Sequence, residues 1–404
     1  MSATAGMSLR GHHETIPPHD LALYIHWPFC ATKCPYCDFN SHVRDTIDVA
    51  EWTQALLTAL RSQAAEVPHH RLHSIFFGGG TPSLMPPAMV AALIEEAKRL
   101  WPHQDSPLEI TLEANPSSVE IARFEALREA GVNRISIGVQ SLDDDHLKFL
   151  GRPHNAAEAR AAIEAAGRIF ANWSLDLIYA LPGDTVATWR QRLDDVIPLL
   201  GNHASLYQLT IEPGTAFYSQ HKRGAFTLPD EETAADLFRF TQDRMAEAGL
   251  PSYEISNHAR PGAQSKHNLV YWRGSDYLGV GPGAHGRIEN HAPPYGRQAR
   301  VAVKKPEAYL RHVAEHGHDL QEVNWIDPKA ATEELVMMAL RIIEGIDLTV
   351  LQRLSRRQVS DTLDEETIDL LCDEGLITCE QNRLALTGKG RPLLNTIAAK
   401  LLKA

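Results

Sequence analysis

Cysteine is scarce in this chain: only five of its 404 residues are cysteines. A small secreted scaffold held together by disulfides uses many more, so that class of protein is excluded. Three of the five lie close together, at Cys30, Cys34 and Cys37. Disulfide pairing within this run would leave one thiol over. We therefore expect reduced thiols and a reducing compartment, the cytoplasm.

Long apolar runs and an excess of positive charge are also missing. No apolar run approaches the roughly 20 residues of a membrane-spanning helix, and the polar segment Met1–Asp20 lacks the apolar core of a signal peptide. We expect no membrane span, and a disordered tail over 1–20. The 39 Lys and Arg residues against 51 Asp and Glu residues give a net charge of −12. That balance argues against a general nucleic-acid-binding protein.

What the chain does have is a dense thiol motif, Cys30-Ala-Thr-Lys-Cys34-Pro-Tyr-Cys37. Thiolates are soft ligands that suit iron–sulfur clusters. Three thiolates can hold three irons of a cubane, which leaves the fourth iron open to a small chelating molecule. Two alternatives stay open at this point. One is a zinc site with His26 or His42 as the fourth ligand, and the other is a chance grouping of cysteines.

Apolar segments alternate with amphipathic segments from Leu21 to about Pro213. The pattern predicts strands at Leu23–Trp27, His73–Phe77, Leu108–Glu113, Arg134–Val139, Ser174–Tyr179 and Leu206–Ile211. It predicts helices at Asp48–Glu66, Pro86–Leu100, Val119–Ala130, Ala156–Phe170 and Thr185–Leu200. Such strand–helix units predict a parallel sheet, either doubly wound or curled into a partial barrel.

Polar or glycine-rich residues lie at the end of nearly every predicted strand. They include the cysteine run, Gly78-Gly79-Gly80-Thr81-Pro82, Glu113, Gln140 and Asp176. Polar groups that converge from many strand ends are typical of the active-site face of a βα barrel. We therefore predict an α/β fold whose core, residues 21–250, is a partial (β/α)6 barrel.

Several of these residues suit a ligand that carries a ribose, an ammonium and a carboxylate. Carboxylates such as Glu113 and Asp176 accept from hydroxyl or ammonium groups, and Arg152 can bind a carboxylate through two hydrogen bonds. Three consecutive glycines let a ligand approach the backbone closely. The alternatives are a tight turn with nothing bound for the glycines, and surface ion pairs or strand caps for Glu113, Gln140, Arg152 and Asp176.

The pattern changes beyond Leu250. A short strand is predicted at Ser252–Ser256, then a loop-rich region, then helices at Pro306–His316 and Pro328–Glu344. Gly281-Pro-Gly283-Ala-His-Gly286 matches G-x-G-x-x-G, but it lacks a convincing preceding strand and a following helix, so we reject a dinucleotide site. We predict instead a loop that shapes a pocket, within an extension over residues 251–327.

The last segment, 328–404, is predicted to contain helices, a hairpin around Ile377–Thr387 and a final helix over Arg391–Leu402, an α+β arrangement like a winged helix. Such modules often bind DNA. Residues 345–404, however, hold eight Lys and Arg against nine Asp and Glu, a difference of −1. We therefore favour a packing or partner-facing domain and no nucleic acid. Cys372 and Cys379 are interpreted as small apolar fillers.

A histidine next to aromatic residues stands out at His267-Asn268-Leu-Val-Tyr271-Trp272. Neutral imidazole binds heme iron, and aromatic faces pack on a porphyrin. The commoner situation is a hydrogen-bonded histidine beside core aromatics, and the residues alone leave both open.

Taken together, these motifs resemble the radical S-adenosylmethionine (SAM) superfamily. Tyr24-Ile-His26, Gly138-Val-Gln140-Ser141, Gly151-Arg152 and Tyr277-Leu-Gly-Val-Gly281 narrow the resemblance to the oxygen-independent coproporphyrinogen III oxidase-like family, from about Leu21 to the end of the chain.

Two branches of that family differ just after the cysteine run. The oxidase has a further cysteine two residues after the third, where this chain has Asp38-Phe39. The heme chaperone branch, HemW, has Cys-Asp-Phe and a His-Asn-x-x-Tyr-Trp motif, which His267–Trp272 matches at every fixed position. The resemblance therefore implies a heme chaperone, with the oxidase of porphyrin biosynthesis as the alternative.

The resemblance also implies site residues, cofactors and partners. Cys30, Cys34 and Cys37 would ligate a [4Fe–4S] cluster; Tyr24, Gly79 and Glu113 would contact the cluster-bound SAM; Tyr36, Gly80, Thr81, Gln140, Arg152 and Asp176 correspond to contacts of a second SAM in the oxidase. Heme would bind at His267, Asn268, Tyr271 and Trp272. The implied partners are heme and heme-acceptor proteins, and a homodimer stays open. Enzyme activity is left undecided.

Overall fold

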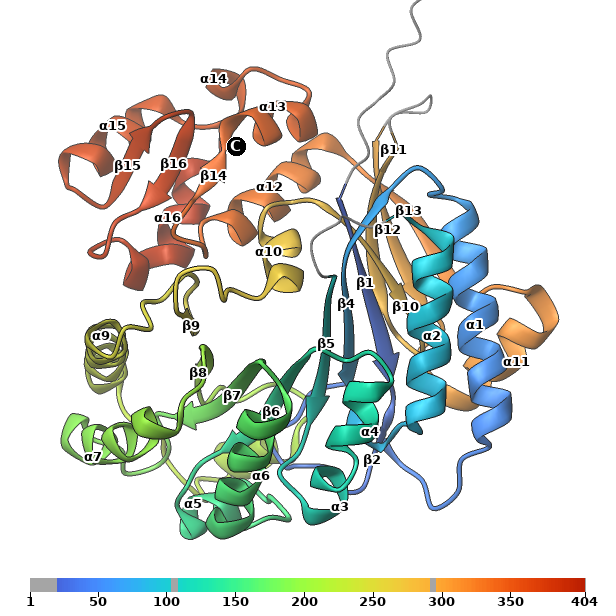
Figure 1. The fold of residues 1–404 in the computed structure, drawn as a ribbon. Helices are drawn as coiled ribbons and strands as arrows, with labels where there is room; N and C mark the ends of the chain where they lie inside the picture. The colour runs from blue at the N-terminus through green and yellow to red at the C-terminus, as the bar shows by residue number, and fades with distance from the viewer. Residues whose placement is uncertain (1–19, 103–107, 291–295, 404) are drawn as a thin grey trace, which may run out of the picture.

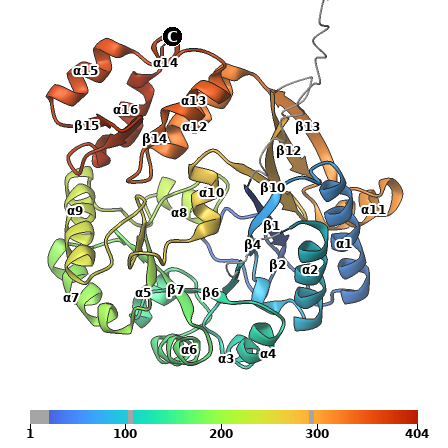
Figure 2. The ribbon, with the colours of Figure 1, turned by 45° about the horizontal axis from the view of Figure 1, so that its top comes forward.

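The computed structural model describes residues 20–102, 108–290 and 296–403. Within these ranges the chain forms a long curved sheet with helices on its outer face (Figures 1 and 2). The predicted tail over 1–20 lies outside the described residues except for Asp20, the first residue of strand β1. Among the described residues, no helix is both long and apolar enough to cross a membrane.

Six parallel strands form the centre of the sheet, in the order of the chain. They are β1 (Asp20–Trp27), β4 (Arg71–Gly79), β5 (Glu109–Ala114), β6 (Arg134–Gln140), β7 (Asn172–Tyr179) and β8 (His203–Gln208). All six correspond to strands expected from the sequence, although β8 begins three residues before the expected Leu206 and ends three residues before Ile211. Short strands β2 (Phe29–Cys30) and β3 (His42–Val43) pair separately.

Helices between the strands cover the outer face, as Figure 2 shows. They are α1 (Val49–Ala65), α2 (Pro87–Leu100), α3 (Ser118–Ile121), α4 (Phe124–Glu129), α5 (Asp144–Phe149), α6 (Ala156–Ile169) and α7 (Val186–Val196), with short 3₁₀ turns at Pro82–Leu84 and Ile197–Leu199; α8 (Ala216–Lys222) and α9 (Glu231–Glu247) follow β8. Helices on the outside of a curved, parallel sheet confirm the partial barrel rather than a doubly wound sheet.

Alternation along each strand separates a core face from a polar face. In β5, Ile110 and Leu112 are buried in the hydrophobic core beneath the helices. Thr111 and Glu113 point the other way, into the barrel, because successive side chains of a strand lie on opposite faces. The same alternation places Ser136 of β6 and Asp176 of β7 inside. The alternation of apolar and polar residues along the strands therefore makes the interior of the barrel polar.

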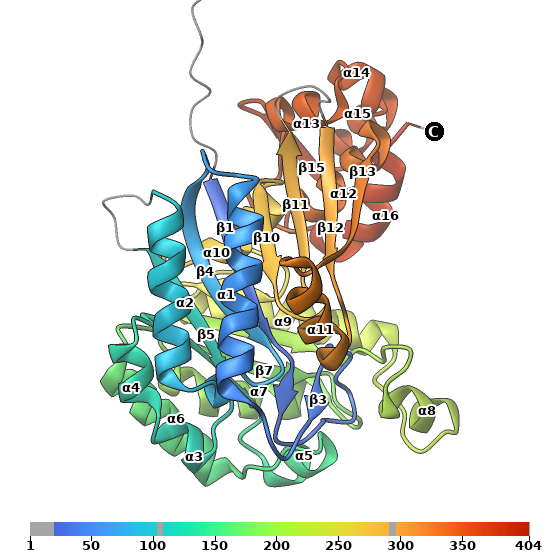
Figure 3. The same cartoon turned by 90° about the vertical axis from the view of Figure 1, so that its right-hand side faces the viewer.

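The extension after residue 250 adds strands to both edges of this sheet. β9 (Asn257–Ala259) pairs with β8, whereas β10 (Asp276–Val280) lies parallel beside β1, and β11 (His285–Asn290), β12 (Gly296–Ala302) and β13 (Leu320–Ile326) follow in antiparallel order. Helix α10 (Lys266–Trp272) lies between β9 and β10 in the chain. Figure 3 shows α11 (Pro306–His316) beside α1, on the side away from α2.

Two expectations for this region were wrong. Ser252–Ser256 is not a strand: Ser252 makes one isolated bridge, and the Glu254 carboxylate accepts from the Ser256 amide in a turn. The glycine motif beginning at Gly281 does follow a strand, β10, although strand β11 rather than a helix comes after it. A dinucleotide site requires the amino terminus of a helix after the glycine motif. Because a strand follows here instead, we still reject a dinucleotide site.

The carboxyl-terminal domain has its own hydrophobic core. It contains α12 (Pro328–Ala339), α13 (Leu348–Ser355), α14 (Val359–Thr362), α15 (Glu365–Asp373) and α16 (Leu394–Leu401), with a 3₁₀ turn at Arg391–Leu393 and a small sheet of β14 (Ile346–Asp347), β16 (Arg383–Leu386) and β15 (Ile377–Glu380). Helices followed by a hairpin give the expected winged-helix-like arrangement. The predicted helix over Val119–Ala130 is interrupted near Arg123, and the one over Pro328–Glu344 ends at Ala339.

Candidate functional site

The three clustered cysteines lie on the loop that follows β1. Cys30 ends β2, and the Cys37 amide donates to the Cys34 carbonyl at 3.2 Å. All three are partly exposed and none forms a disulfide. The donor set, three free thiols on one loop at the carboxyl ends of the strands, fits an iron–sulfur cluster with one iron left for another ligand.

Asn40 holds this loop in place. Its side-chain amide donates to the Pro282 carbonyl at 2.8 Å and to the Lys304 carbonyl at 2.9 Å. Its own backbone carbonyl accepts from His26 Nε2 at 2.9 Å. Gly281 is needed for the close approach, since a Cβ there would lie 2.4 Å from the His26 carbonyl oxygen. The glycine motif therefore supports the cysteine loop from behind.

The zinc alternative finds no fourth ligand in this arrangement. His26 Nε2 binds the Asn40 carbonyl, and His26 Nδ1 lies 3.0 Å from the Tyr24 hydroxyl. His42 Nε2 lies 3.2 Å from Asn40 Oδ1. Among the residues that the structure describes, no three His, Cys, Asp or Glu side chains are grouped as for a single metal ion.

The glycine run after β4 packs tightly against β1 and β2. The Gly80 amide donates to the Trp27 carbonyl at 2.7 Å. Gly79 has a φ of +112°, and a Cβ at this position would lie 2.5 Å from the His26 ring. Protein contacts alone thus require glycine at both positions. The Gly79 amide also donates to Glu113 Oε2 at 3.2 Å, which joins the run to the barrel interior.

Arg152 connects the cysteine loop to the ends of β5 and β6. Its Nη1 lies 3.4 Å from Cys34 Sγ and 3.4 Å from the Tyr36 hydroxyl. Its Nη2 donates to the Asn115 side-chain oxygen and to the Gly138 carbonyl. The Nε atom is buried without a hydrogen-bond partner. Since no carboxylate pairs with this guanidinium in the part of the chain that is described, Arg152 has capacity left for an anionic ligand.

A polar cavity of about 230 Å³ lies inside the barrel. Its walls include Tyr24, Glu113, Arg134, Asp176 and His267. Burial, together with the negative charge of Asp176, raises the pKa of Glu113 to about 8. Burial also raises the pKa of Asp176, whose carboxylate accepts from Ser136 Oγ at 3.1 Å. Two buried carboxyl groups with raised pKa values that face one cavity are typical of a functional site.

Three more of the expected residues lie near the strand ends rather than in this cavity. Gln140 ends β6 with a φ of +64°, an uncommon conformation for a residue other than glycine. Thr81 is buried, and its hydroxyl accepts from Asn115 Nδ2 at 3.1 Å. The Tyr36 ring packs at a tilt against Phe217, and burial raises the pKa of Tyr36.

His267 enters the same cavity from α10, which lies against β1 and β4 on the face opposite α1 and α2 (Figure 2). It is buried, with Nδ1 at 2.9 Å from Ser74 Oγ and Nε2 at 2.6 Å from the Tyr271 hydroxyl. Its ring stacks on Phe76, 4.9 Å between centroids. Burial lowers the pKa of His267 to about 3, so the imidazole is neutral. As it stands, His267 is a hydrogen-bonded core histidine.

The other members of the His267–Trp272 motif separate. Asn268 and Tyr271 line the cavity, whereas Trp272 packs in a different apolar cluster beside Tyr253. Sequence reasoning missed that this motif and Glu113 share one cavity. It also missed the inner polar residues Arg134, Ser136, His203, Ser205, Tyr207 and Asn257. The alternating polar positions of β6 and β8 were the available signal.

Comparison with known proteins agrees with this geometry. Residues 24–196 match the family model of the radical SAM superfamily, and residues 326–393 match that of the HemN C-terminal domain. The chain is 38% identical to the heme chaperone HemW of Haemophilus influenzae, over 95% of this chain and 97% of that protein. It is 37% identical to HemW of Escherichia coli, with the same coverage of each chain.

A mitochondrial relative and a solved structure extend the comparison. The mitochondrial radical S-adenosyl methionine domain-containing protein 1 of Bos taurus is 37% identical, over 94% of this chain and 87% of that protein. The structure of coproporphyrinogen III oxidase (HemN) from Escherichia coli, a radical SAM enzyme, has a TM-score of 0.77 and 23% identity, and the match covers 96% of this chain and 91% of that one. At that identity the likeness concerns the fold. From its near-complete match to the HemW proteins, the chain belongs to the HemW family within the radical SAM superfamily.

Proposed function

We propose that this protein is a heme chaperone of the reducing cytoplasm, which binds heme and transfers it to acceptor hemoproteins. The observation that carries the proposal is the similarity over almost the whole chain to proteins named heme chaperone HemW, 37–38% identical. Asp38-Phe39 after the cysteine run supports it, because the oxidase branch has a cysteine at the second of these positions.

Membership of the radical SAM superfamily implies a [4Fe–4S] cluster and SAM. We propose that Cys30, Cys34 and Cys37 hold the cluster, whose chemistry when bound is electron transfer and chelation of SAM at the open iron. Glu113 is placed to accept from a ligand ammonium, provided that it first loses its proton. Gly79 already fixes one of its oxygens at 3.2 Å, and Tyr24 lines the same cavity.

Arg152, Asp176, Gln140, Tyr36, Gly80 and Thr81 are proposed as contacts of a second SAM molecule. Arg152 offers the chemistry that a carboxylate needs, a buried guanidinium with one N–H unused. The proposed role of the cluster and SAM is to support assembly, as a homodimer, or the transfer step.

Heme is proposed to bind at His267, with Asn268, Tyr271 and Trp272 around it. A neutral imidazole is the form that binds iron. The cavity of about 230 Å³ is smaller than the about 300–1,000 Å³ of sites that bury small ligands. Heme ligation through His267 Nε2 therefore requires α10 to move and the hydrogen bond to Tyr271 to break.

The second function is that of the oxidase, oxidative decarboxylation of coproporphyrinogen III. The shared fold and the buried carboxylates of the barrel favour it. The cavity volume does not separate the two functions, because heme and coproporphyrinogen III are both tetrapyrroles and the cavity of about 230 Å³ would have to widen for either. The absence of the oxidase's additional cysteine argues against the oxidase.

One experiment separates the two functions. The protein is reconstituted anaerobically with iron, sulfide and SAM, then titrated with heme and, in parallel, incubated with coproporphyrinogen III and a reductant. We expect a Soret band with saturable heme binding and no decarboxylated product. A Cys30→Ala, Cys34→Ala, Cys37→Ala variant serves as the cluster-free control. Substantial product formation that depends on these cysteines would overturn the chaperone proposal in favour of the oxidase.

A further inference from the structure

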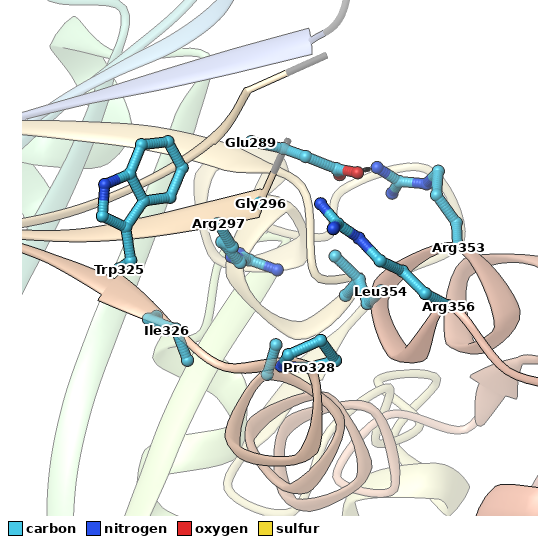
Figure 4. Close-up of a pocket in the computed structure, with 10 residues that line it drawn as sticks. Glu289, Gly296, Arg297, Trp325, Ile326, Pro328, Arg353, Leu354 and Arg356 are labelled. Atoms are coloured by element: carbon cyan, nitrogen blue, oxygen red, sulfur yellow. Dashed lines mark ion pairs between the residues drawn. The ribbon is translucent and has the colours of Figure 1, made fainter. Parts of the chain in front are cut away.

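A second pocket, of about 200 Å³, lies where the extension meets the carboxyl-terminal domain. Figure 4 shows its walls: Arg297 and Trp325 come from the sheet, whereas Arg353 and Arg356 come from the end of α13 and the residue after it. None of the motifs used above contributes to this pocket. It is therefore a feature of the fold to which no role has been assigned.

The described residues that line this pocket include one acidic side chain and three arginines. Glu289 forms an ion pair with Arg353. Arg297 is 5% exposed and makes no ion pair with a carboxylate in the described part of the chain. Its Nη atoms donate to two backbone carbonyls, and its Nε is buried without a partner. A buried guanidinium without a counter-ion is costly, so the pocket favours an incoming anion.

An aromatic surface lies beside this guanidinium. Trp325, on edge strand β13, is 48% exposed and lines the pocket. A Cβ at Gly296 would lie 3.1 Å from the Trp325 ring. Glycine at this position therefore leaves the edge of the indole uncovered on the pocket side. Arginine beside an open indole is suited to a planar, apolar ligand that carries a carboxylate.

Arg297 also connects the pocket to α10. Its Nη1 donates to the Gly274 carbonyl at 3.0 Å, and its Nη2 donates to the Ser275 carbonyl at 3.2 Å. These two residues follow Arg273, the residue that caps the carboxyl end of α10, and α10 carries the His267–Trp272 motif. The Arg297 side chain therefore connects an anion in this pocket to the end of α10, the helix that must move to admit heme.

We propose that this pocket binds the propionate carboxylates of heme, with Arg297 and Arg356 as the charged partners and Trp325 as the apolar one. The inference rests on the proposed function, which supplies a planar ligand with two carboxylates. A volume of about 200 Å³ suits the propionate edge of the macrocycle and leaves the rest outside.

The test compares heme with heme dimethyl ester, in which both carboxylates are blocked. The full-length protein is titrated with each, and the dissociation constants are read from the Soret band. We expect heme to bind about tenfold or more tightly than the ester, the ratio that a charge-assisted hydrogen bond provides. Arg297→Gln and the exposed Arg356→Gln should each reduce this ratio toward one. Arg287→Gln, on neighbouring β11 and paired with Glu334, is the matched control and should keep it.

The possible outcomes distinguish failure of the propionate site from failure of the proposed chaperone function. Equal binding of heme and its ester, or an unchanged ratio in both pocket variants, would overturn the propionate site and leave the chaperone proposal standing. Absence of any heme binding would overturn both. Arg297→Gln could weaken heme binding simply by disturbing the fold. Arg356→Gln controls for this, because the Arg356 side chain is exposed and its loss leaves the hydrogen bonds of the buried Arg297 intact.

Discussion

At the scale of single residues, the charge of Glu113 depends on what is bound beside it. Its folded-state pKa of about 8 lies well above the ordinary value of 4.5, because the carboxyl is buried and faces Asp176. Between these two values the folded protein keeps a proton that the unfolded chain releases. The stability of the SAM-free protein should therefore fall as pH rises from about 4.5 to about 8.

Glu113→Gln should remove this loss. Glutamine imitates the protonated acid, so the variant should melt several degrees above the wild type at pH 8.5, because keeping the proton from pH 4.5 up to about 8 is worth about 4–5 kcal/mol. The difference should shrink toward zero at pH 5. Thermal melts without SAM across this pH range measure it, with the exposed Glu125→Gln as control. If the difference in melting temperature between the variant and the wild type is the same at pH 5 and at pH 8.5, the pKa of Glu113 is not raised.

The hydrogen bond between His267 and Tyr271 opposes heme ligation in the structure. Tyr271→Phe removes a bond worth about 0.5–1.5 kcal/mol and should tighten heme binding by up to about tenfold. His267→Ala should weaken binding and alter the Soret band. Heme titrations measure both, with Tyr277→Phe as the neighbouring control. If His267→Ala binds heme like the wild type, another ligand holds the iron.

At the scale of elements, the loop after β10 supports the cysteine loop through a glycine. Gly281→Ala would meet a φ of +108° and a carbonyl oxygen 2.4 Å from the new Cβ. We expect a loss of about 2–3 kcal/mol in the free energy of unfolding and poorer retention of the cluster. Gly262→Ala separates the two causes, because Gly262 has a φ of +83° and no atom near its Cβ position.

That control should cost about 1 kcal/mol, the conformational part alone. Denaturant titration gives both free energies, and the visible absorbance of the cluster under chelator gives its retention. Similar losses in the two alanine variants would mean that the contact with the His26 carbonyl is not the cause.

The sequence predicts those helices and strands whose apolar pattern is complete within a short stretch of residues. The six barrel strands and α11, Pro306–His316, followed from apolar patterns within short windows. Strands β10 to β12 and helix α10 did not, because glycine and aromatic residues blur any period in that region. The cysteine spacing predicted the role of the cysteine loop, and the place of Glu113 at the end of a predicted strand indicated that it belongs to the site. The position of His267 beside Glu113 depends on α10 returning to the barrel from a distant part of the chain.

At the scale of the whole molecule, the carboxyl-terminal domain spans the open side of the partial barrel (Figure 2). Near β9 it is held by the buried Glu254, whose carboxylate pairs with Arg341, just after α12. On the β11 side it is held by Arg353, paired with Glu289. The β9 end of the curved sheet and strand β11, toward its other end, are therefore joined through one domain.

Arg341→Ala should loosen this closure. It leaves the Glu254 carboxylate buried with two hydrogen bonds, from Ser256 and Asn257, and with Arg391 as a nearby positive charge, but without an ion pair among the described residues. We expect a loss of about 1–3 kcal/mol in the free energy of unfolding, together with faster hydrogen exchange in β9. Arg273→Ala, which breaks a more exposed pair with Glu344, should cost less than about 1 kcal/mol. Equal costs for the two variants would contradict a closing role for Arg341.

The contact between the cysteine loop and His26 has one more consequence. The Asn40 carbonyl can only accept, so His26 Nε2 carries the ring proton and Nδ1 is left as an acceptor. The Tyr24 hydroxyl then directs its proton to Nδ1 and offers only lone pairs to the barrel interior. A ligand group opposite Tyr24 has to be a donor, an ammonium or a hydroxyl, and a carboxylate would be repelled. The loop that bears the thiols thus fixes, through a single tautomer, the direction in which hydrogen bonds run along this wall of the barrel.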